Sequence, residues 1–378
     1  MSTIPFNQSS PVGRELEYVD KAVRDGQTAG NGEFSKRCEA LMKDVFSAKR
    51  VFLTPSCTAA LEMSSVVCNL QPGDEVIMPS YTFVSTANAF VLRGVKPRFV
   101  DIRADTKNID ETLIESAITD RTRAIVPVHY AGIGCDMDSI RATASKHGLY
   151  VIEDAAQGVN ASSQEGYLGT LGHLGAYSFH ATKNYSCGEG GALLVNDESM
   201  IERAEIIQEK GTNRSRFMRG QVDKYTWVDV GSSYLLSEIL AAHLLGQLEE
   251  LEKINLDRQR IYERYLQLLQ PLFEKGLLEF PVLPDTSKTN YHMFYVLTQD
   301  QDSRNSLISF LKTKGITATF HYVPLHSSPM GEQLGSAGLS LPVTDRVSAC
   351  LVRLPMYFEL QDEQVDYVAG CISEFFRV

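Results

Sequence analysis

The sequence lacks the features that mark secreted, metal-binding and membrane-spanning proteins. Its seven cysteines form an odd, scattered set in which no two have the spacing of a zinc site, which argues against a disulfide framework and against a bound metal. No run approaches the roughly 20 apolar residues that span a bilayer, and residues 1–11 lack the basic start and apolar core of a signal peptide. There is no internal repeat. These absences predict a cytoplasmic protein with no metal and no membrane partner.

The overall charge is acidic, with 47 acidic and 36 basic side chains and a net charge of −11. Nucleic acid is therefore not an expected partner. Residues 210–224 have the opposite sign, with five basic side chains and one acidic one. Such a run is usually a solvated surface loop, but Tyr225 and Trp227 follow it directly, which favours a substrate or subunit interface. The basic residues are Lys210, Arg214, Arg216, Arg219 and Lys224.

Apolar strands alternate with helical stretches from about residue 51 to residue 195, which predicts an α/β protein with a largely parallel sheet and helices on both faces. Ligands of such sheets bind outside the C-terminal ends of the strands. Apolar periodicity over residues 237–269 predicts one long helix, and Pro281 and Pro284 mark the region where a smaller α/β unit begins. We expect a large domain over residues 1–255 and a small C-terminal domain over residues 256–378. The expected strands of the sheet are 51–53, 75–78, 98–100, 124–128, 150–153, 176–179 and 192–195, and the small unit comprises 293–297, 305–314, 317–320 and 363–376.

Lys183 is the most informative residue of the chain. It follows the apolar run at residues 175–177 and shortly precedes the glycine-rich residues 188–191. A lysine amine condenses with an aldehyde, so a lysine at the end of a buried strand indicates a Schiff-base lysine for pyridoxal phosphate. Lysines in loops are more often solvated surface residues, so this interpretation depends on the rest of the chain.

Asp154 ends a short apolar strand and is followed by small residues. An ionised carboxylate at the C-terminal edge of a parallel strand can pair with the protonated pyridine nitrogen of that cofactor. The alternative is that Asp154 only caps the next helix. Glu153 is expected to point to the opposite face of the strand, toward a helix or the solvent.

Residues 54–63 place small and hydroxylated side chains between a strand and a helix. A helix that opens in this way exposes unpaired backbone N–H groups, which can bind a phosphate dianion. We therefore predict that Thr58 and Ala59 bind phosphate mainly through backbone amides, with a hydroxyl from Ser178; a simple N-cap is the alternative. Phe83 is predicted to cover one face of the pyridine ring, although aromatic residues at such positions are more often part of the core.

These groups occur in the order that is found in one known family. The chain resembles the fold-type I pyridoxal phosphate enzymes, and specifically the DegT-type nucleotide-sugar aminotransferases, over nearly its whole length. The motifs that carry the resemblance are Pro5-Phe6, Gly30-Asn31-Gly32, residues 154–157, 178–184 and 320–326, and Leu354-Pro355. Within the family the chain is most similar to the dTDP-4-amino-4,6-dideoxygalactose transaminases, through residues 54–58, 210–215, 220–227 and 231–235.

The resemblance implies transfer of an amino group from glutamate to the C4 keto group of a dTDP-4-keto-6-deoxyhexose, for surface polysaccharide biosynthesis. Relatives that dehydrate the sugar carry histidine in place of Lys183, so the lysine argues for transamination. Gln157 is implied to lie near the cofactor ring or its hydroxyl. The alternatives are an aminotransferase for 3-keto sugars, a pyridoxal phosphate-dependent sugar dehydratase, and a cofactor-binding regulatory protein without turnover.

The resemblance also implies a homodimer or higher homo-oligomer with shared active sites. Family members usually have Gly-x-Asn-x-Arg where this chain has residues 231–235, so Ser233 stands in place of an asparagine that reaches the neighbour's cofactor phosphate. A serine hydroxyl can still bond a phosphate oxygen, although it supplies only one donor. Arg214 and Arg219 are expected to contact the anionic nucleotide sugar.

Four histidines are candidate substrate contacts. His180 lies three residues before Lys183, and His129 follows the strand expected at residues 124–128. For both of these, a structural role is as plausible as a contact with the sugar. His321 and His326 flank Pro324 in a segment that approaches the sugar ring in the family.

Overall fold

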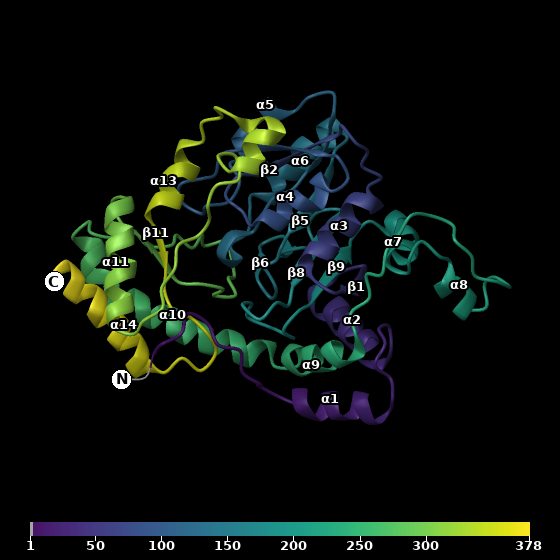
Figure 1. Cartoon of the computed structure of the whole chain (residues 1–378), viewed down its shortest axis with the longest axis horizontal. Coiled ribbons are helices and arrows are strands. Elements are labelled where there is room, and N and C mark those ends of the chain that lie inside the picture. The colour runs from purple at the N-terminus through teal and green to yellow at the C-terminus, as the bar shows by residue number, and fades with distance from the viewer. Residues whose placement is uncertain (1–2) are drawn as a thin grey trace.

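The computed structural model describes residues 3–378, and its central feature is a seven-stranded sheet (Figure 1). The strands are β1 (Arg50–Thr54), β2 (Glu75–Pro79), β3 (Lys96–Val100), β4 (Thr122–Ile125), β5 (Tyr150–Asp154), β8 (Leu174–Ser178) and β9 (Gly191–Val195). Their order in the sheet is β1-β9-β8-β5-β4-β2-β3. Strand β9 is antiparallel to its neighbours β1 and β8, whereas the other pairs are parallel. The predicted mainly parallel sheet is therefore confirmed.

Helices cover both faces of the sheet. Alternate residues of a strand point to opposite faces, so each strand contributes side chains to two cores. Leu193 and Val195 of β9 pack in one core with three helices, α3 (Cys57–Val67), α4 (Val84–Val91) and α7 (Ile201–Gln208). Ala192 and Leu194 of the same strand pack in the other core. The helices of that second core are α1 (Glu15–Arg24), α2 (Glu33–Phe46), α6 (Met137–His147) and α9 (Glu238–Leu248).

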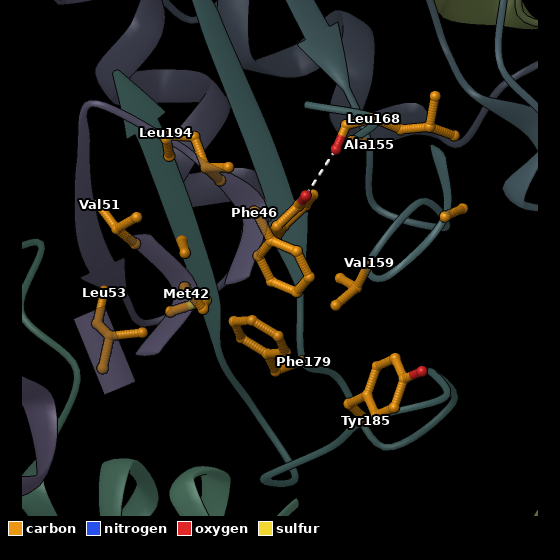
Figure 2. Close-up of a cluster of buried hydrophobic side chains, with 14 of the residues drawn as sticks. Met42, Phe46, Val51, Leu53, Ala155, Val159, Leu168, Phe179, Tyr185 and Leu194 are labelled. Atoms are coloured by element: carbon orange, nitrogen blue, oxygen red, sulfur yellow. Dashed lines mark hydrogen bonds between the residues drawn. The ribbon is translucent and has the colours of Figure 1, made fainter. Parts of the chain in front are cut away.

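The second core also holds both ends of the loop that carries Lys183. Figure 2 shows Phe179 and Tyr185, on either side of this loop, in the same cluster as Phe46 of α2. The Phe46 ring meets the Tyr177 ring edge to face, with centroids 5.5 Å apart. Because Phe179 and Tyr185 are at most 1% exposed, the burial of two large rings fixes where the loop leaves and rejoins the core.

The prediction of one long helix over residues 237–269 is wrong. The chain forms two helices, α9 and α10 (Leu251–Glu274), separated at Glu249 and Glu250. Ile254 of α10 packs in the core of the sheet, whereas Ile261 packs in the core of the small domain. The predicted domain boundary after residue 255 falls inside this continuous helix, between these two contacts.

The small domain is built on a two-stranded antiparallel sheet of β10 (Tyr295–Leu297) and β11 (Leu351–Arg353). The expected strand at residues 317–320 forms only a bridge between Thr319 and Arg353. Ile4 packs in the small-domain core and forms a β-bridge with Ile316. Farther along the N-terminal segment, Asn7 donates to the Ala181 carbonyl of the large domain at 2.8 Å. The helices of this half are α11 (Gln301–Thr313), α12 (Pro329–Gly331), α13 (Pro342–Cys350) and α14 (Asp362–Phe376).

Helix α8 (Arg214–Met218) and its flanking loops stand away from the sheet at the right of Figure 1. The remaining α-helix and strands are short: α5 (Ile114–Ala117), β6 (Ser162–Ser163) and β7 (Gly166–Tyr167). Between residues 3 and 378, no helix is both long and apolar enough to cross a membrane. In the same described range, no group of three or more histidine, cysteine or acidic side chains is placed to hold a metal ion.

Candidate active site

A cavity of about 570 Å³ opens at the C-terminal ends of β5 and β8, where the two domains meet. This is the edge at which ligands of parallel sheets bind. The large domain contributes residues that follow its strands, and the small domain contributes His292, residues 319–322 and Arg353. The predicted residues that line the cavity are Thr58, Phe83, Asp154, Gln157, Ser178, His180, Lys183 and His321.

Lys183 lies on the cavity wall in the loop between β8 and β9. A turn in which the Lys183 N–H donates to the His180 carbonyl at 2.9 Å shapes this loop. Desolvation lowers the pKa of the Lys183 amine to about 8, although Cys57 and Asp154 oppose the shift. A larger share of the amine is therefore neutral near pH 7 than for an ordinary lysine, and the neutral amine is the form that attacks an aldehyde.

Asp154 is 5% exposed and ends β5 at the cavity. Its Oδ2 accepts a hydrogen bond from the Thr86 hydroxyl at 2.6 Å, and its Oδ1 accepts one from the Ala156 N–H at 3.1 Å. The alternative of a helix cap is wrong, because residues 155–161 form turns and no helix follows. A fixed carboxylate at this place can pair with a cation inside the cavity.

Glu153, the preceding residue, faces the core and not the solvent. Its carboxylate accepts hydrogen bonds from the N–H groups of Gly169, Leu171 and Gly172 at 2.7, 2.7 and 2.5 Å. His129 Nε2 lies 2.8 Å from the same carboxylate. The expectation of a solvent or helix contact for Glu153 is therefore wrong. Its carboxylate instead holds the loop that leads into β8 by hydrogen bonds.

The N-terminus of α3 forms part of the cavity wall. The Ala59 N–H donates to the Ser56 hydroxyl at 3.1 Å, so Ser56 is the N-cap. Among residues 3–378, no hydrogen bond occupies the N–H groups of Cys57 and Thr58, which also line the cavity. Together with the Ser178 hydroxyl, these N–H groups can hold an anion. Gly191 permits the arrangement, because a Cβ there would lie 2.4 Å from the Cys57 nitrogen.

Phe83 and Gln157 line the cavity, and both contact Tyr322. The Phe83 ring is 57% exposed, and its centroid lies 6.3 Å from that of Tyr322. Gln157 is buried, donates to the Tyr322 hydroxyl at 3.0 Å, and accepts from the Ala131 N–H at 2.6 Å. These contacts leave the Phe83 ring free to cover a ligand and hold the Gln157 side chain in place.

Two of the four predicted substrate histidines lie away from the cavity. His129 is fully buried between Glu153 and the Cys135 N–H, which donates to its Nδ1 at 3.1 Å. His326 is 3% exposed and hydrogen-bonds to the Ser80 hydroxyl at 2.8 Å. For both residues the predicted substrate contact is wrong, because their ring nitrogens are used inside the core.

His180 and His321 do line the cavity. His180 is half-buried, with its Nδ1 2.9 Å from the Thr182 hydroxyl and its Nε2 3.5 Å from Glu189. His321 lies deeper, and burial together with the nearby Arg353 and Lys183 cations holds its pKa well below the ordinary range. It is therefore a neutral imidazole at pH 7.

Among the cavity residues that were not predicted from the sequence are three large polar side chains of the small domain: Tyr322, His292 and Arg353. Tyr322 lies inside the motif at residues 320–326, and Arg353 directly precedes Leu354-Pro355. Their positions in these motifs could therefore have identified both as candidate site residues. His292 lies in none of the motifs. Its Nδ1 lies 2.8 Å from the Asn184 side chain, and burial with nearby cations keeps its pKa well below the ordinary range.

Besides Ala59, His129 and His326, three predicted residues do not line the cavity of their own chain. Arg219 makes a bidentate ion pair with Glu205, at 2.7 and 2.8 Å, which uses part of the positive charge of residues 210–224. Arg214 begins the projecting helix α8, and Ser233 is exposed and bridges to Glu209.

Comparison with known proteins agrees with this geometry. Residues 11–373 match the DegT/DnrJ/EryC1/StrS aminotransferase family. The chain is 34% identical over 364 residues to the "pleiotropic regulatory protein" of Geobacillus stearothermophilus, which covers 96% of this chain and 94% of that protein. It is similar in structure to the aminotransferase TlmJ from Streptoalloteichus hindustanus, with a TM-score of 0.90, 28% identity and coverage of 100% of this chain and 99% of that one. NtdA from Bacillus subtilis, solved with bound cofactor PMP, has a TM-score of 0.89, 27% identity and coverage of 100% and 86%.

Pyridoxal phosphate fits the residues of the cavity. Lys183 supplies an amine of lowered pKa, Asp154 a buried carboxylate, and the α3 N-terminus free N–H groups. When bound, this cofactor supplies an electron sink for the charge left on an amine-bearing carbon. The fold, with TM-scores near 0.9 to aminotransferases, is that of the fold-type I enzymes. The chain thus belongs to the DegT/DnrJ/EryC1/StrS family and is a pyridoxal phosphate-dependent sugar aminotransferase.

Proposed function

We propose that the enzyme transfers the amino group of L-glutamate to the C4 keto group of a dTDP-4-keto-6-deoxyhexose. The product would be dTDP-4-amino-4,6-dideoxygalactose, a precursor for surface polysaccharide. The observation that carries the proposal is the Lys183 amine, which shares one cavity at the strand ends with the Asp154 carboxylate. The motifs at residues 54–58, 210–215, 220–227 and 231–235 support the choice of sugar.

The residues have distinct roles in this proposal. Lys183 holds the cofactor, then takes the proton from the amine-bearing carbon of the donor and later returns a proton to the sugar carbon. Asp154 keeps the pyridine nitrogen protonated, and Phe83 covers the ring. Gln157 lies beside the ring, where Tyr322 orients its side chain. Thr58, Ala59 and Ser178 belong to the phosphate end, although the Ala59 N–H already has a partner in Ser56.

The complete site is proposed to form in a homodimer. Helix α8 and its loops stand away from their own sheet and expose large apolar side chains, including Met218 at 71% and Trp227 at 77%. Exposed apolar surface on a projecting segment favours contact with another chain. The projecting segment would bring Arg214, Arg219 and Ser233 to the neighbour's cavity. A cytoplasmic location is part of the proposal, since both the nucleotide-linked sugar and glutamate occur in the cytoplasm.

The test is product analysis by NMR after incubation with dTDP-4-keto-6-deoxyglucose and L-glutamate. The expected product carries an axial amine at C4, which the small coupling constants of its H4 proton identify. Parallel reactions with a 3-keto isomer and with a UDP-linked sugar measure regiochemistry and base preference. Amination at C3, or loss of water without amination, would replace the proposal with one of the other sugar reactions.

A regulatory protein without turnover is the second candidate, since the relative from Geobacillus stearothermophilus is named for regulation. The absorbance spectrum of the holoenzyme separates the two. Addition of glutamate should convert the aldehyde form of the cofactor to the amine form if the protein is a working transaminase. A spectrum that stays unchanged with glutamate and with the aminated sugar would favour the regulatory candidate.

A further inference from the structure

His292 is held in one tautomer by Asn184, the residue that follows Lys183. The Asn184 side chain donates from Nδ2 to the Asn290 carbonyl at 2.7 Å, and its Oδ1 lies 2.8 Å from His292 Nδ1. A carbonyl oxygen only accepts hydrogen bonds, so the nitrogen of Asn184 faces Asn290 and its oxygen faces His292. Since this amide oxygen also only accepts, the proton of the imidazole is on Nδ1.

The other ring nitrogen of His292, Nε2, keeps a free lone pair. Burial and the nearby cations hold the pKa of His292 well below its ordinary value, so the ring carries only the proton on Nδ1. Among residues 3–378, Nε2 has no hydrogen-bond partner and is not enclosed by protein, so it opens onto the cavity that His292 and Lys183 both line. The same two residues line a second cavity of only about 10 Å³. Their side chains therefore lie close together.

The Lys183 amine has charged neighbours in the cavity, but within residues 3–378 it has no hydrogen-bond partner of its own. A lysine side chain has a flexible four-carbon stem, so an amine that takes and returns a proton at one carbon must be held near that carbon. A carboxylate partner would favour the protonated amine, which cannot take a proton. A neutral acceptor instead holds the amine through one N–H and leaves its lone pair for the reaction.

The electrostatic surroundings keep the imidazole neutral and the amine ready to change its charge. Burial is the largest effect on both groups: it lowers the pKa of His292 well below its ordinary value and that of Lys183 to about 8. The other titratable groups near the two side chains are Cys57, Asp154, Arg258, His321 and Arg353. Near pH 8 the pair is thus a neutral acceptor beside an amine that exists in both protonation states.

We propose that His292 is a positioning residue, whose Nε2 accepts a hydrogen bond from the free Lys183 amine and holds it while the lysine moves protons in amino transfer. The inference rests on the role of Lys183 in the proposed function, but it does not depend on which sugar accepts the amine. Asn184 completes the arrangement. Its side chain sets the tautomer of His292 and joins the loop that carries Lys183 to the small domain.

The first test reads the imidazole by NMR, without turnover. The full-length protein is labelled in its histidine ring nitrogens and measured as apoprotein and with the cofactor in its amine form; the His292 signals are assigned by their loss in His292→Gln. We expect a protonated Nδ1 and an unprotonated Nε2. Lys183→Met, which has a side chain of similar length but no N–H, should shift the Nε2 signal and leave the Nδ1 signal in place.

The second test separates the two ring nitrogens by substitution. The amide of asparagine lies where Nδ1 of histidine lies, and the amide of glutamine reaches one bond further, to the position of Nε2. His292→Asn therefore keeps the bond to Asn184 and loses the acceptor for Lys183, whereas His292→Gln does the reverse. With glutamate at saturation, conversion of the cofactor to its amine form should slow by roughly 10-fold to 100-fold in His292→Asn. In His292→Gln the rate should stay within about threefold of wild type.

His173 provides the matched control. It is half-buried, its Nδ1 accepts from the Val151 N–H at 2.9 Å, and it does not line the cavity. His173→Asn and His173→Gln should both leave the rate of cofactor conversion unchanged.

The pH dependence of pyridoxal phosphate uptake by the apoprotein supplies a readout that a merely structural role would not change. An acceptor stabilises the protonated amine more than the neutral one, so its loss lowers the pKa of the amine. The half-maximal rate, expected near pH 8 in the wild type, should move to lower pH in His292→Asn and stay in place in His292→Gln.

Three outcomes would overturn the role of His292. One is a proton on Nε2, or an Nε2 signal that does not respond to Lys183→Met. Another is a wild-type rate in a folded His292→Asn. The third is a loss of rate in His292→Gln that equals or exceeds the loss in His292→Asn, which would mean that only the bond to Asn184 matters. If His292→Asn does not fold, the NMR comparison of the wild type with Lys183→Met decides. A wild-type enzyme that does not react with glutamate would refute the proposed function, whereas the NMR experiment would still decide on the hydrogen bond.

Discussion

Replacement of Asp154 by asparagine should slow amino transfer and leave the fold intact. The carboxylate is 5% exposed and is held by the Thr86 hydroxyl and the Ala156 N–H. Asparagine has nearly the same shape, and its Oδ1 can still accept from one of these donors. What the change removes is the negative charge that would keep a cofactor's pyridine nitrogen protonated, so the loss should appear in rate and not in stability.

The magnitude follows from the burial of the pair. Removal of one partner from a buried charged pair costs about 3–5 kcal/mol. If this cost appears entirely in the transition state, the rate falls by roughly 150-fold to 5,000-fold. The assay is a stopped-flow measurement of the cofactor absorbance after addition of glutamate at saturation, with cofactor binding measured separately. Cofactor affinity should change far less than the rate.

Glu153→Gln is the matched control, because Glu153 is the adjacent carboxylate of the same strand but faces the core. It accepts three backbone N–H groups, from Gly169, Leu171 and Gly172. A neutral amide would weaken these bonds, each worth roughly 1.5–3 kcal/mol when one partner is charged, so the melting temperature should fall. The rate per folded enzyme should stay near that of the wild type. Near-normal rates for Asp154→Asn would refute the role assigned to Asp154, as would an equal loss of rate in both variants.

Four further predictions concern the lysine and the assembly. Lys183→Ala should lose the visible absorbance of the bound cofactor and all turnover, and an alanine variant that keeps both would refute the assignment. The pKa of the Lys183 amine is lowered from 10.5 to about 8, so the rate of cofactor uptake by the apoprotein should rise with pH up to about 8 and then level off; a rise that continues to pH 10 would contradict this. The same depressed pKa predicts that the free energy of unfolding of the apoprotein rises between about pH 8 and 10.5, because the unfolded chain then binds more protons. Mixing Lys183→Ala subunits with subunits that carry Arg214→Ala and Arg219→Ala, once this pair is shown to be inactive alone, should restore activity; exchange confirmed by mass without activity would mean that each subunit builds its own site.

The sequence by itself determined the sheet and the large-domain side of the cavity. Short, continuous apolar runs define strands that are buried on both faces, such as β5 and β8. A polar residue at the C-terminal end of such a parallel strand lies at the ligand-binding edge of the sheet. Asp154, Ser178 and Lys183 therefore reach one cavity, as their positions in the sequence predict. The break between α9 and α10 was not predictable in this way, because the apolar periodicity continues across Glu249 and Glu250.

Only the tertiary structure decided which polar residues face the cavity and which serve the core. His326 belongs to the same sequence motif as His321, and His129 follows a strand of the sheet. Their ring nitrogens nevertheless find partners inside the core, in Ser80 and Glu153, which are 246 and 24 residues away in the sequence. Arg353 is brought to Lys183 by the packing of the two domains, across 170 residues of chain. A local sequence pattern predicts where a residue lies within its own strand or loop. Whether that residue then meets a core partner or an open cavity depends on contacts between segments far apart, and these form only when the domains pack.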